Sequence, residues 1–461
     1  MSTGDFKPPM PPTVDRKPMI LRLLNGVSRN NLSNFLEKSY EMKMGHFWLP
    51  GRDVYMPNLP ELAHKILVSD AEHYPKSDLL SNMLKMLLGN GVFVANGEDW
   101  KQQRRLIDPA FALARLERVF PLMQQACDGM FDRLANVPDG SEVLIDEHMT
   151  HVTADVIFRT MFSTGLKQDG ADKLFDAFMR FQESAFVVGM LESTWLPSIF
   201  GVRQKRAAKK AGQEIRKLIE PFVENRYRRV QRGETLETVD ILSFLVEGSD
   251  PKTGARFSLN ELVDQTAFLF LAGHETSASA LSWSLYLLAM SEEAQRRVYD
   301  EVRSVTQGGP IEHRHIRELA FTRNVFREAL RLYPPVGFLP REATRPEVMR
   351  DKNIKPRDVM LICPWLIHRH RLIWHKPDVF DPGRFETENC KHALKSHAYM
   401  PFSMGPRTCT GAGFATQEAI LILASLISAY RLDPVHGHVP KPVGRLTIRA
   451  ENGIKLVLKR R

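Results

Sequence analysis

The chain has 461 residues, of which 43% are hydrophobic and 25% charged, and its formal net charge is +9. This balance is typical of a globular protein. A basic protein can bind nucleic acid or anionic lipid, but the sequence has no zinc-finger or RNP signature and no dense Lys/Arg tract interleaved with aromatics, so no nucleic-acid partner is expected.

The N-terminal stretch "MSTGDFKPPMPPTVDRKPM" is proline-rich and polar. It lacks the apolar segment of a signal peptide or a spanning helix, so we expect a soluble, cytoplasmic protein without a transmembrane anchor. Its four cysteines, Cys127, Cys363, Cys390 and Cys409, are then reduced thiols. With no linker or repeat in view, we treat residues 1–40 as an extension and 40–461 as one domain.

The first predicted elements are two short strands within residues 46–58, on either side of the turn at Pro50-Gly51. Helical periodicity then dominates from about residue 100 to 335. The stretch "GEDWKQQRRLIDPAF" predicts an amphipathic helix with Trp100 and Arg104 four residues apart on one face.

Residues 174–200 are rich in large apolar side chains, and a basic helix follows them. Its cations are Arg203, Lys205, Arg206, Lys209 and Lys210. A solvated helix face and a membrane-surface patch are both open interpretations of this segment.

A long helix is predicted after Ser258, because Ser258 and Glu261 form an S-x-x-E capping box and no proline follows until well beyond Met290. Glu275 and Thr276 lie in its middle, next to Gly273. Polar groups at the centre of a buried helix are costly unless they have a purpose, and we expect Gly273 to permit a local distortion of the helix there.

The chain becomes irregular after Pro335, and its end, "LTIRAENGIKLVL", alternates around Asn452-Gly453 and predicts a hairpin. Together these elements predict a mainly α fold with small β-sheets.

The stretch "PFSMGPRTCTGAGFA" places Cys409 among Gly405, Gly411 and Gly413, with Arg407 two residues before it. Glycines allow tight turns and close approach to a flat partner. A helix that begins just after Cys409 would direct N–H groups at the sulfur and stabilise a thiolate. A thiolate on a rigid loop suits the axial position of a haem iron, whereas the plainer alternative is a buried structural cysteine.

The pattern Phe402-x-x-Gly405-x-Arg407-x-Cys409-x-Gly411 resembles the haem-binding signature of the cytochrome P-450 family. Three further motifs occur in the family's order: "AGHETS", the E-x-x-R of "REALRLYPP", and the meander "VFDPGRF". The resemblance implies a long central helix over the haem and a C-terminal loop that carries the cysteine ligand.

The resemblance also assigns roles to residues. Cys409 would ligate the iron of haem b, beside Phe402, Arg407 and Gly411; Trp100, Arg104 and Arg341 would contact haem propionates; Glu275 and Thr276 would handle protons on the oxygen side; and Glu328, Arg331 and Arg384 would be structural. The implied activity is that of a monooxygenase, an oxidoreductase that inserts one atom of O2 into its substrate.

The apolar segments 79–94 and 174–200 match substrate-contacting regions of the family and favour a lipophilic substrate: a fatty acid, a terpenoid or a steroid-like molecule. We expect no fused reductase, so electrons would come from a ferredoxin and a NAD(P)H-dependent ferredoxin reductase, with the ferredoxin docking near Lys101 and Arg105. The chain resembles soluble, monomeric bacterial members, within a branch close to fatty-acid hydroxylases and microsomal enzymes. A peroxide-driven peroxygenase and a non-catalytic haem-thiolate sensor are the alternatives.

Overall fold

The structure is a computed structural model that describes residues 6–13, 30–49, 51–77, 89–166, 173–174, 176–178, 180–181, 202–236, 240–444 and 446–461. The predicted segments 79–94 and 174–200 lie mostly outside these residues, and so does the side chain of Cys390.

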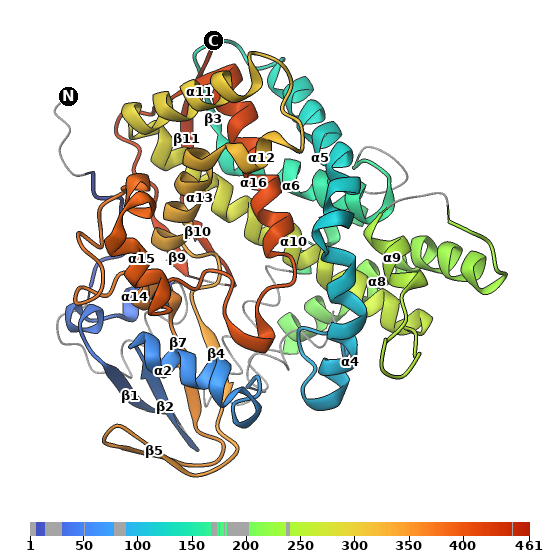
Figure 1. Ribbon diagram of the computed structural model, residues 1–461, viewed down its shortest axis with the longest axis vertical. Coiled ribbons are helices and arrows are strands. Elements are labelled where there is room, and N and C mark those ends of the chain that lie inside the picture. The colour runs from blue at the N-terminus through green and yellow to red at the C-terminus, as the bar shows by residue number, and fades with distance from the viewer. Residues whose placement is uncertain are drawn as a thin grey trace.

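Helices make up most of the molecule, and the main sheet lies at one edge, at the lower left of Figure 1. The expected mainly α class with small β-sheets is confirmed. The helices are α2 (Pro60–His64), α4 (Gly97–Ile107), α5 (Leu113–Leu134), α6 (Ile145–Phe162), α8 (Val202–Gln231), α9 (Ile241–Glu247), α10 (Leu259–Ala289), α11 (Glu292–Thr306), α12 (His315–Glu318), α13 (Ala320–Leu332), α14 (Pro364–Ile367), α15 (Glu388–Lys395) and α16 (Ala412–Ala429).

The main sheet has the order β1-β2-β7-β4, in which β2 and β7 are parallel and the other pairs antiparallel. Its strands are β1 (Met44–Leu49), β2 (Arg52–Pro57), β4 (Leu339–Glu342) and β7 (Val359–Ile362). The predicted strand pair around Pro50-Gly51 is therefore confirmed as β1 and β2.

Three small sheets complete the fold. A three-stranded sheet has the order β3-β11-β8, and β10 pairs with β9 and β5 with β6. Their strands are β3 (Ser141–Leu144), β5 (Glu347–Met349), β6 (Lys352–Ile354), β8 (Tyr430–Pro434), β9 (Pro442–Gly444), β10 (Ile448–Ala450) and β11 (Lys455–Arg460).

The predicted C-terminal hairpin is wrong. The turn at Asn452-Gly453 exists, and Gly453 has the positive φ of 68° that favours glycine. The strands on its two sides nevertheless join different sheets, because β10 pairs with β9 whereas β11 pairs with β3 and β8. The local pattern identified the turn but not the distant partner strands.

Helix α10 runs through the centre of the molecule, as Figure 1 shows. The predicted capping box is present: the Ser258 hydroxyl accepts the Glu261 N–H at 3.4 Å, and the Glu261 carboxylate accepts the Ser258 N–H at 2.9 Å. The helix continues without a break past Gly273, so the expected distortion is absent. A Cβ at Gly273 would lie 2.7 Å from Ile157 Cδ1, so this glycine lets α6 approach closely.

The expected Glu328, Arg331 and Arg384 cluster forms where α13 meets residues 375–384. Arg331 donates two hydrogen bonds to the Glu328 carboxylate, at 2.7 and 2.8 Å, and Arg384 Nε donates to Glu328 Oε1 at 3.3 Å. Burial alone would raise the pKa of Glu328, but the two guanidinium groups lower it. The glutamate therefore stays ionised inside the protein and ties α13 to the meander.

Part of the N-terminal extension packs on this core. The Tyr333 hydroxyl donates to the Pro9 carbonyl at 2.7 Å, and the Phe380 N–H donates to the Phe6 carbonyl at 3.1 Å. The one described helix that is long and apolar enough to cross a membrane is α16, and most of it is buried inside the protein.

Candidate functional site

The loop before Cys409 is held by its backbone. The Cys409 N–H donates to the Phe402 carbonyl at 2.9 Å, and the Thr408 N–H donates to the Gly405 carbonyl at 3.0 Å. Gly405 has a φ of 71°, and a Cβ there would lie 2.2 Å from the Leu67 carbonyl oxygen. Only glycine fits this position, so the sequence pattern reflects a real backbone requirement.

The Cys409 thiol lies at the start of α16, as predicted. Protein atoms crowd the sulfur and raise the pKa of the thiol by desolvation, while the Gly411 N–H and the Arg104 charge act in the opposite direction. The side chain nevertheless has an exposed surface. The cysteine side chain is therefore held among protein atoms but can still be reached by a ligand.

Trp100 and Arg104 of α4 both contact the cysteine loop. Arg104 Nη1 donates to the Thr408 carbonyl at 2.9 Å, next to the cysteine, and the Arg407 guanidinium lies 4.2 Å from the centre of a Trp100 ring. Arg407 also donates to Asn96 Oδ1 at 2.7 Å. The structure therefore brings three of the predicted haem contacts together around one loop.

Arg341 joins this group as a buried residue on β4, and burial lowers its pKa to about 10. Burial, with Arg341 and Arg104 nearby, lowers the pKa of Arg407 to about 9. Within the described part of the chain, neither guanidinium has a carboxylate partner, and Arg407 Nη1 is buried without a hydrogen bond. Arg341 is buried and Arg407 half-buried, so an anionic group that binds between them would offset the cost of two desolvated cations.

Lys76 is a fourth cation here that sequence reasoning missed. Its Nζ donates to the Phe93 carbonyl at 2.6 Å and lies 3.5 Å from the centre of the Phe93 ring. Desolvation, together with Arg341, Arg407 and Arg104, lowers the pKa of Lys76 well below its usual range. No local pattern marks this lysine, because its neighbours come from segments far along the chain.

The residues around Cys409 fit a haem. Cys409 would hold the haem iron through its sulfur, as a thiolate. The cations Lys76, Arg341 and Arg407 suit the two carboxylates of the haem edge, and the unpaired Arg407 Nη1 supplies a free donor for one of them.

Thr276 lies on a stripe of partly exposed residues in the otherwise buried α10. Phe268, Ala272 and Thr276 are spaced four residues apart, so they share one helix face. The Thr276 hydroxyl donates to the Ala272 carbonyl at 2.7 Å, which leaves its oxygen free to accept a hydrogen bond. Two apolar side chains next to one hydroxyl form a surface that suits an apolar molecule beside a polar reaction centre.

Glu275, the neighbour of Thr276, points in a different direction. Its Oε1 accepts from the Thr447 hydroxyl at 2.6 Å, and its Oε2 accepts from Arg449 Nη2. Both partners come from the C-terminal segment at β10. The two predicted proton-handling residues therefore contact different parts of the protein.

Glu418 of α16 is a second buried carboxyl group that the sequence did not indicate. The Ser277 hydroxyl, one residue after Thr276, donates to Glu418 Oε2 at 2.6 Å. Burial raises the pKa of Glu418 to about 8, since no cation lies close enough to compensate. At neutral pH this carboxyl is mostly protonated.

The predicted docking cations are not free. Arg105 donates two hydrogen bonds of 2.8 Å to Asp250, whose carboxylate is buried, and this pairing lowers the pKa of Asp250. Lys101 pairs with Glu98 and Glu72. An internal acid therefore neutralises Arg105, and ferredoxin docking near Lys101 and Arg105 stays a prediction.

Known proteins match nearly the whole length of this chain. The family model Cytochrome P450 matches residues 9–457. Cyclooctatin synthase of Streptomyces melanosporofaciens is 31% identical over 400 residues, which are 87% of this chain and 85% of that protein. Cytokinin hydroxylase of Arabidopsis thaliana is 32% identical over 406 residues, 87% of this chain and 77% of that protein.

A more distant relative is the human ultra-long-chain fatty acid omega-hydroxylase. It is 28% identical over 445 residues, which are 91% of this chain and 82% of that protein. The family model spans most of the sequence, and two relatives exceed 30% identity over more than three quarters of both chains. The chain therefore belongs to the cytochrome P450 family.

Proposed function

We propose that this protein inserts one oxygen atom of O2 into a lipophilic substrate, with Cys409 as the thiolate ligand of its haem. The family consists of haem b monooxygenases, so the chain is an oxidoreductase of that kind. The observation that carries the residue assignment is the group of unpaired cations around an accessible, glycine-positioned cysteine.

The haem, when bound, supplies the oxygen chemistry, and thiolate donation favours O–O cleavage. The protein residues hold and orient it. Arg407, Arg341 and Lys76 would bind the two carboxylates, and Trp100 would fix the Arg407 guanidinium by stacking. The rigid hydrogen bond from Cys409 N–H to Phe402 O would keep the sulfur at one position.

Thr276 and Glu275 would manage protons on the other side. The Thr276 hydroxyl already donates to Ala272 O, so it can accept a hydrogen bond from a group on its exposed side. Glu275 would supply protons from the protein, since it is the nearest carboxyl in the sequence. Losing a positioned proton donor typically costs 10²- to 10⁴-fold in the step that it serves.

A terpenoid or a fatty acid is the substrate class that we favour. The stripe formed by Phe268 and Ala272 is apolar next to Thr276, and Phe93 stacks on Phe268 with ring centres 5.4 Å apart. Relatives named cyclooctatin synthase and fatty acid omega-hydroxylase agree with an apolar substrate. A titration of the ferric protein with terpenes, fatty acids and steroids tests this, because a bound substrate shifts the haem absorption spectrum to the high-spin type.

Electrons would come from a ferredoxin and its reductase. The exposed start of α5 is the better docking candidate, because Leu113 is 62% exposed and lies beside Gly413, close to the cysteine loop, with the exposed Arg118 on the same helix. Arg118→Glu should slow reduction by an acidic ferredoxin and reduce its salt dependence. Arg228→Glu, on α8, is the control.

Product formation with NADPH and a surrogate ferredoxin system tests the monooxygenase itself. Turnover with hydrogen peroxide alone, and none with NADPH, would identify a peroxygenase. Haem binding without turnover under either condition, across substrates that give the high-spin spectrum, would identify a sensor.

A further inference from the structure

Two residues at the end of α4 hold the chain on both sides of Cys409. Before the cysteine, Arg104 Nη1 donates to the Thr408 carbonyl at 2.9 Å. After the cysteine, the Thr410 hydroxyl donates to Asp108 Oδ1 at 2.6 Å. The haem-binding signature leaves position 410 open, so the family pattern does not account for this second contact.

The Asp108 carboxylate joins the two contacts. Arg104 Nε lies 3.0 Å from Oδ1 and 3.1 Å from Oδ2 of this aspartate. A partly exposed pair four residues apart on a helix usually contributes little to stability. Here each member of the pair has a second hydrogen bond, and both of these bonds end on the cysteine loop. The pair is therefore a bridge from α4 to residues 408 and 410.

Helix α4 is itself fixed by contacts away from the cysteine loop. Arg105 donates two hydrogen bonds of 2.8 Å to Asp250, a geometry that fixes direction as well as distance. The buried Asp250 carboxylate also accepts from the Lys252 N–H at 3.0 Å and from the Thr253 hydroxyl at 2.9 Å. The bridge to the cysteine loop thus starts from a helix that is anchored elsewhere in the protein.

We propose that Asp108 is a positioning residue for the thiolate ligand. Through Arg104 and Thr410 it holds both neighbours of Cys409, and it thereby sets how firmly the sulfur stays on the haem iron and how easily the haem is reduced. Groups that bind and orient the ligands of a metal commonly tune its properties. The proposal rests on the proposed function, in which Cys409 ligates the haem.

The charge of Asp108 determines the direction of the effect on reduction. The carboxylate offsets the charge of Arg104, whose guanidinium reaches the carbonyl next to the cysteine. One-electron reduction adds a negative charge to the haem, so a carboxylate nearby disfavours it. Asp108→Asn keeps an oxygen that can accept from Thr410 but removes the charge. This variant should therefore have a higher haem reduction potential than the wild type.

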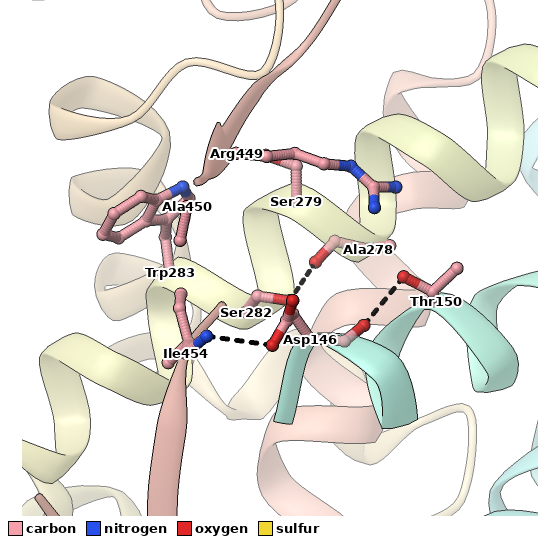
Figure 2. A pocket seen from close by; sticks show the side chains of 9 residues that line it. All are labelled: Asp146, Thr150, Ala278, Ser279, Ser282, Trp283, Arg449, Ala450 and Ile454. Carbon is pink, nitrogen blue, oxygen red and sulfur yellow. Dashed lines mark hydrogen bonds between the residues drawn. The ribbon is translucent and has the colours of Figure 1, made fainter. Parts of the chain in front are cut away.

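A redox titration of the substrate-free enzyme against a dye of known potential measures this change without turnover. The equilibrium constant for one-electron reduction should rise at least about threefold in Asp108→Asn. The matched control is Asp146→Asn, which removes the same charge at the start of α6. Figure 2 shows Asp146 beside Ile454, whose N–H donates to Asp146 Oδ1 at 2.9 Å. Equal reduction potentials in the two variants would overturn the proposal.

Thr410→Val tests the hydrogen bond itself, because valine has the shape of threonine without the hydroxyl. In the reduced protein with carbon monoxide, the haem-thiolate band should disappear about three- to tenfold faster in Thr410→Val than in the wild type. Thr410→Ser keeps a hydroxyl and should restore the wild-type rate. The control is Thr416→Val, which removes a hydroxyl that donates within α16, to the Ala412 carbonyl at 2.7 Å.

Two results at residue 410 contradict the positioning role. Either Thr410→Val loses the band no faster than Thr416→Val, or Thr410→Ser fails to restore the wild-type rate. A wild type that lacks the haem-thiolate band would instead reject the proposed function, so the two failures are distinguishable. Haem content and thermal unfolding of each variant establish that it is folded, and if Asp108→Asn does not retain haem, the variants of Thr410 decide the proposal by themselves.

Discussion

Glu418→Gln should make the stability of this protein less dependent on pH. Glu418 lies buried on α16 with one hydrogen bond, from Ser277, and burial raises the pKa of the carboxyl to about 8. In the unfolded chain the same group has its ordinary value of 4.5. Between these two values the folded protein holds a proton that the unfolded chain has released.

The sign follows from proton linkage. A raised folded-state pKa contributes stability that is fully present below the unfolded value and is lost as pH rises toward and through the folded value. At about 1.4 kcal/mol for each unit of pKa, the wild type should lose about 2.5 kcal/mol relative to the glutamine variant between pH 5.5 and pH 7.5. For a chain of this size that corresponds to a change in Tm of about 2–3 °C.

The assay compares the unfolding of wild type and Glu418→Gln at the two pH values, at constant ionic strength and full haem occupancy. As the pH rises, the free energy of unfolding of Glu418→Gln should increase relative to that of the wild type. Glu220→Gln, at an exposed position of α8, should show no such trend. The reasoning is refuted if the difference in free energy of unfolding between wild type and Glu418→Gln is the same at pH 5.5 and pH 7.5. A carboxyl whose pKa is raised in the folded protein must lose its contribution to stability as the pH rises over this range.

Cys409→Ser should lose the absorption band that the reduced haem-thiolate protein gives with carbon monoxide, while Cys127→Ser should keep it, because Cys127 is buried on α5. Thr276→Ala should consume NADPH at a comparable rate but release hydrogen peroxide in place of product. The assay measures NADPH, hydrogen peroxide and product in one reaction. If Thr276→Ala still converts most of the NADPH consumed into product, this threonine has only a structural role. Gly405→Ala should destabilise the protein by more than Gly437→Ala: both have a positive φ, which costs about 1–2 kcal/mol, but a Cβ at Gly437 meets nothing within 4 Å. Equal unfolding midpoints would contradict the predicted clash with Leu67.

Sequence reasoning succeeded where the determinants are local. The capping box at Ser258 fixes the start of α10, and Gly405 has the positive φ that a local turn requires, although its close neighbour Leu67 is distant in the sequence. The Glu328 and Arg331 pair is three residues apart on one helix turn. Each of these features needs only a short stretch of chain, so a short pattern identifies it.

Sequence reasoning failed where contacts between segments far apart in the sequence determine the structure. The C-terminal alternation predicts a hairpin, but β11 finds better partners in β3 and β8, and the partner of Arg105 is Asp250, 145 residues away. The sequence predicts a local distortion of α10 at Gly273, whereas the small size of this glycine allows close approach of Ile157 on α6. Lys76 carries no local signal, since its charge matters only beside Arg341 and Arg407.

The charge distribution links the haem site to the stability of the fold. Arg341 is buried and Arg407 half-buried, and neither has a carboxylate partner in the described chain. Burial lowers the pKa of both guanidinium groups, and the charges of Arg341 and Arg104 lower that of Arg407 further. Other buried arginines are treated in different ways: Glu328 neutralises Arg331, whereas Arg369 stacks on Trp365. Arg341 and Arg407 have no carboxylate partner beside Cys409, and a haem ligated by Cys409 would bring two carboxylates to that place. Binding the haem would then supply the missing counter-charges, and since only the folded chain gathers these cations, haem binding and folding would stabilise one another.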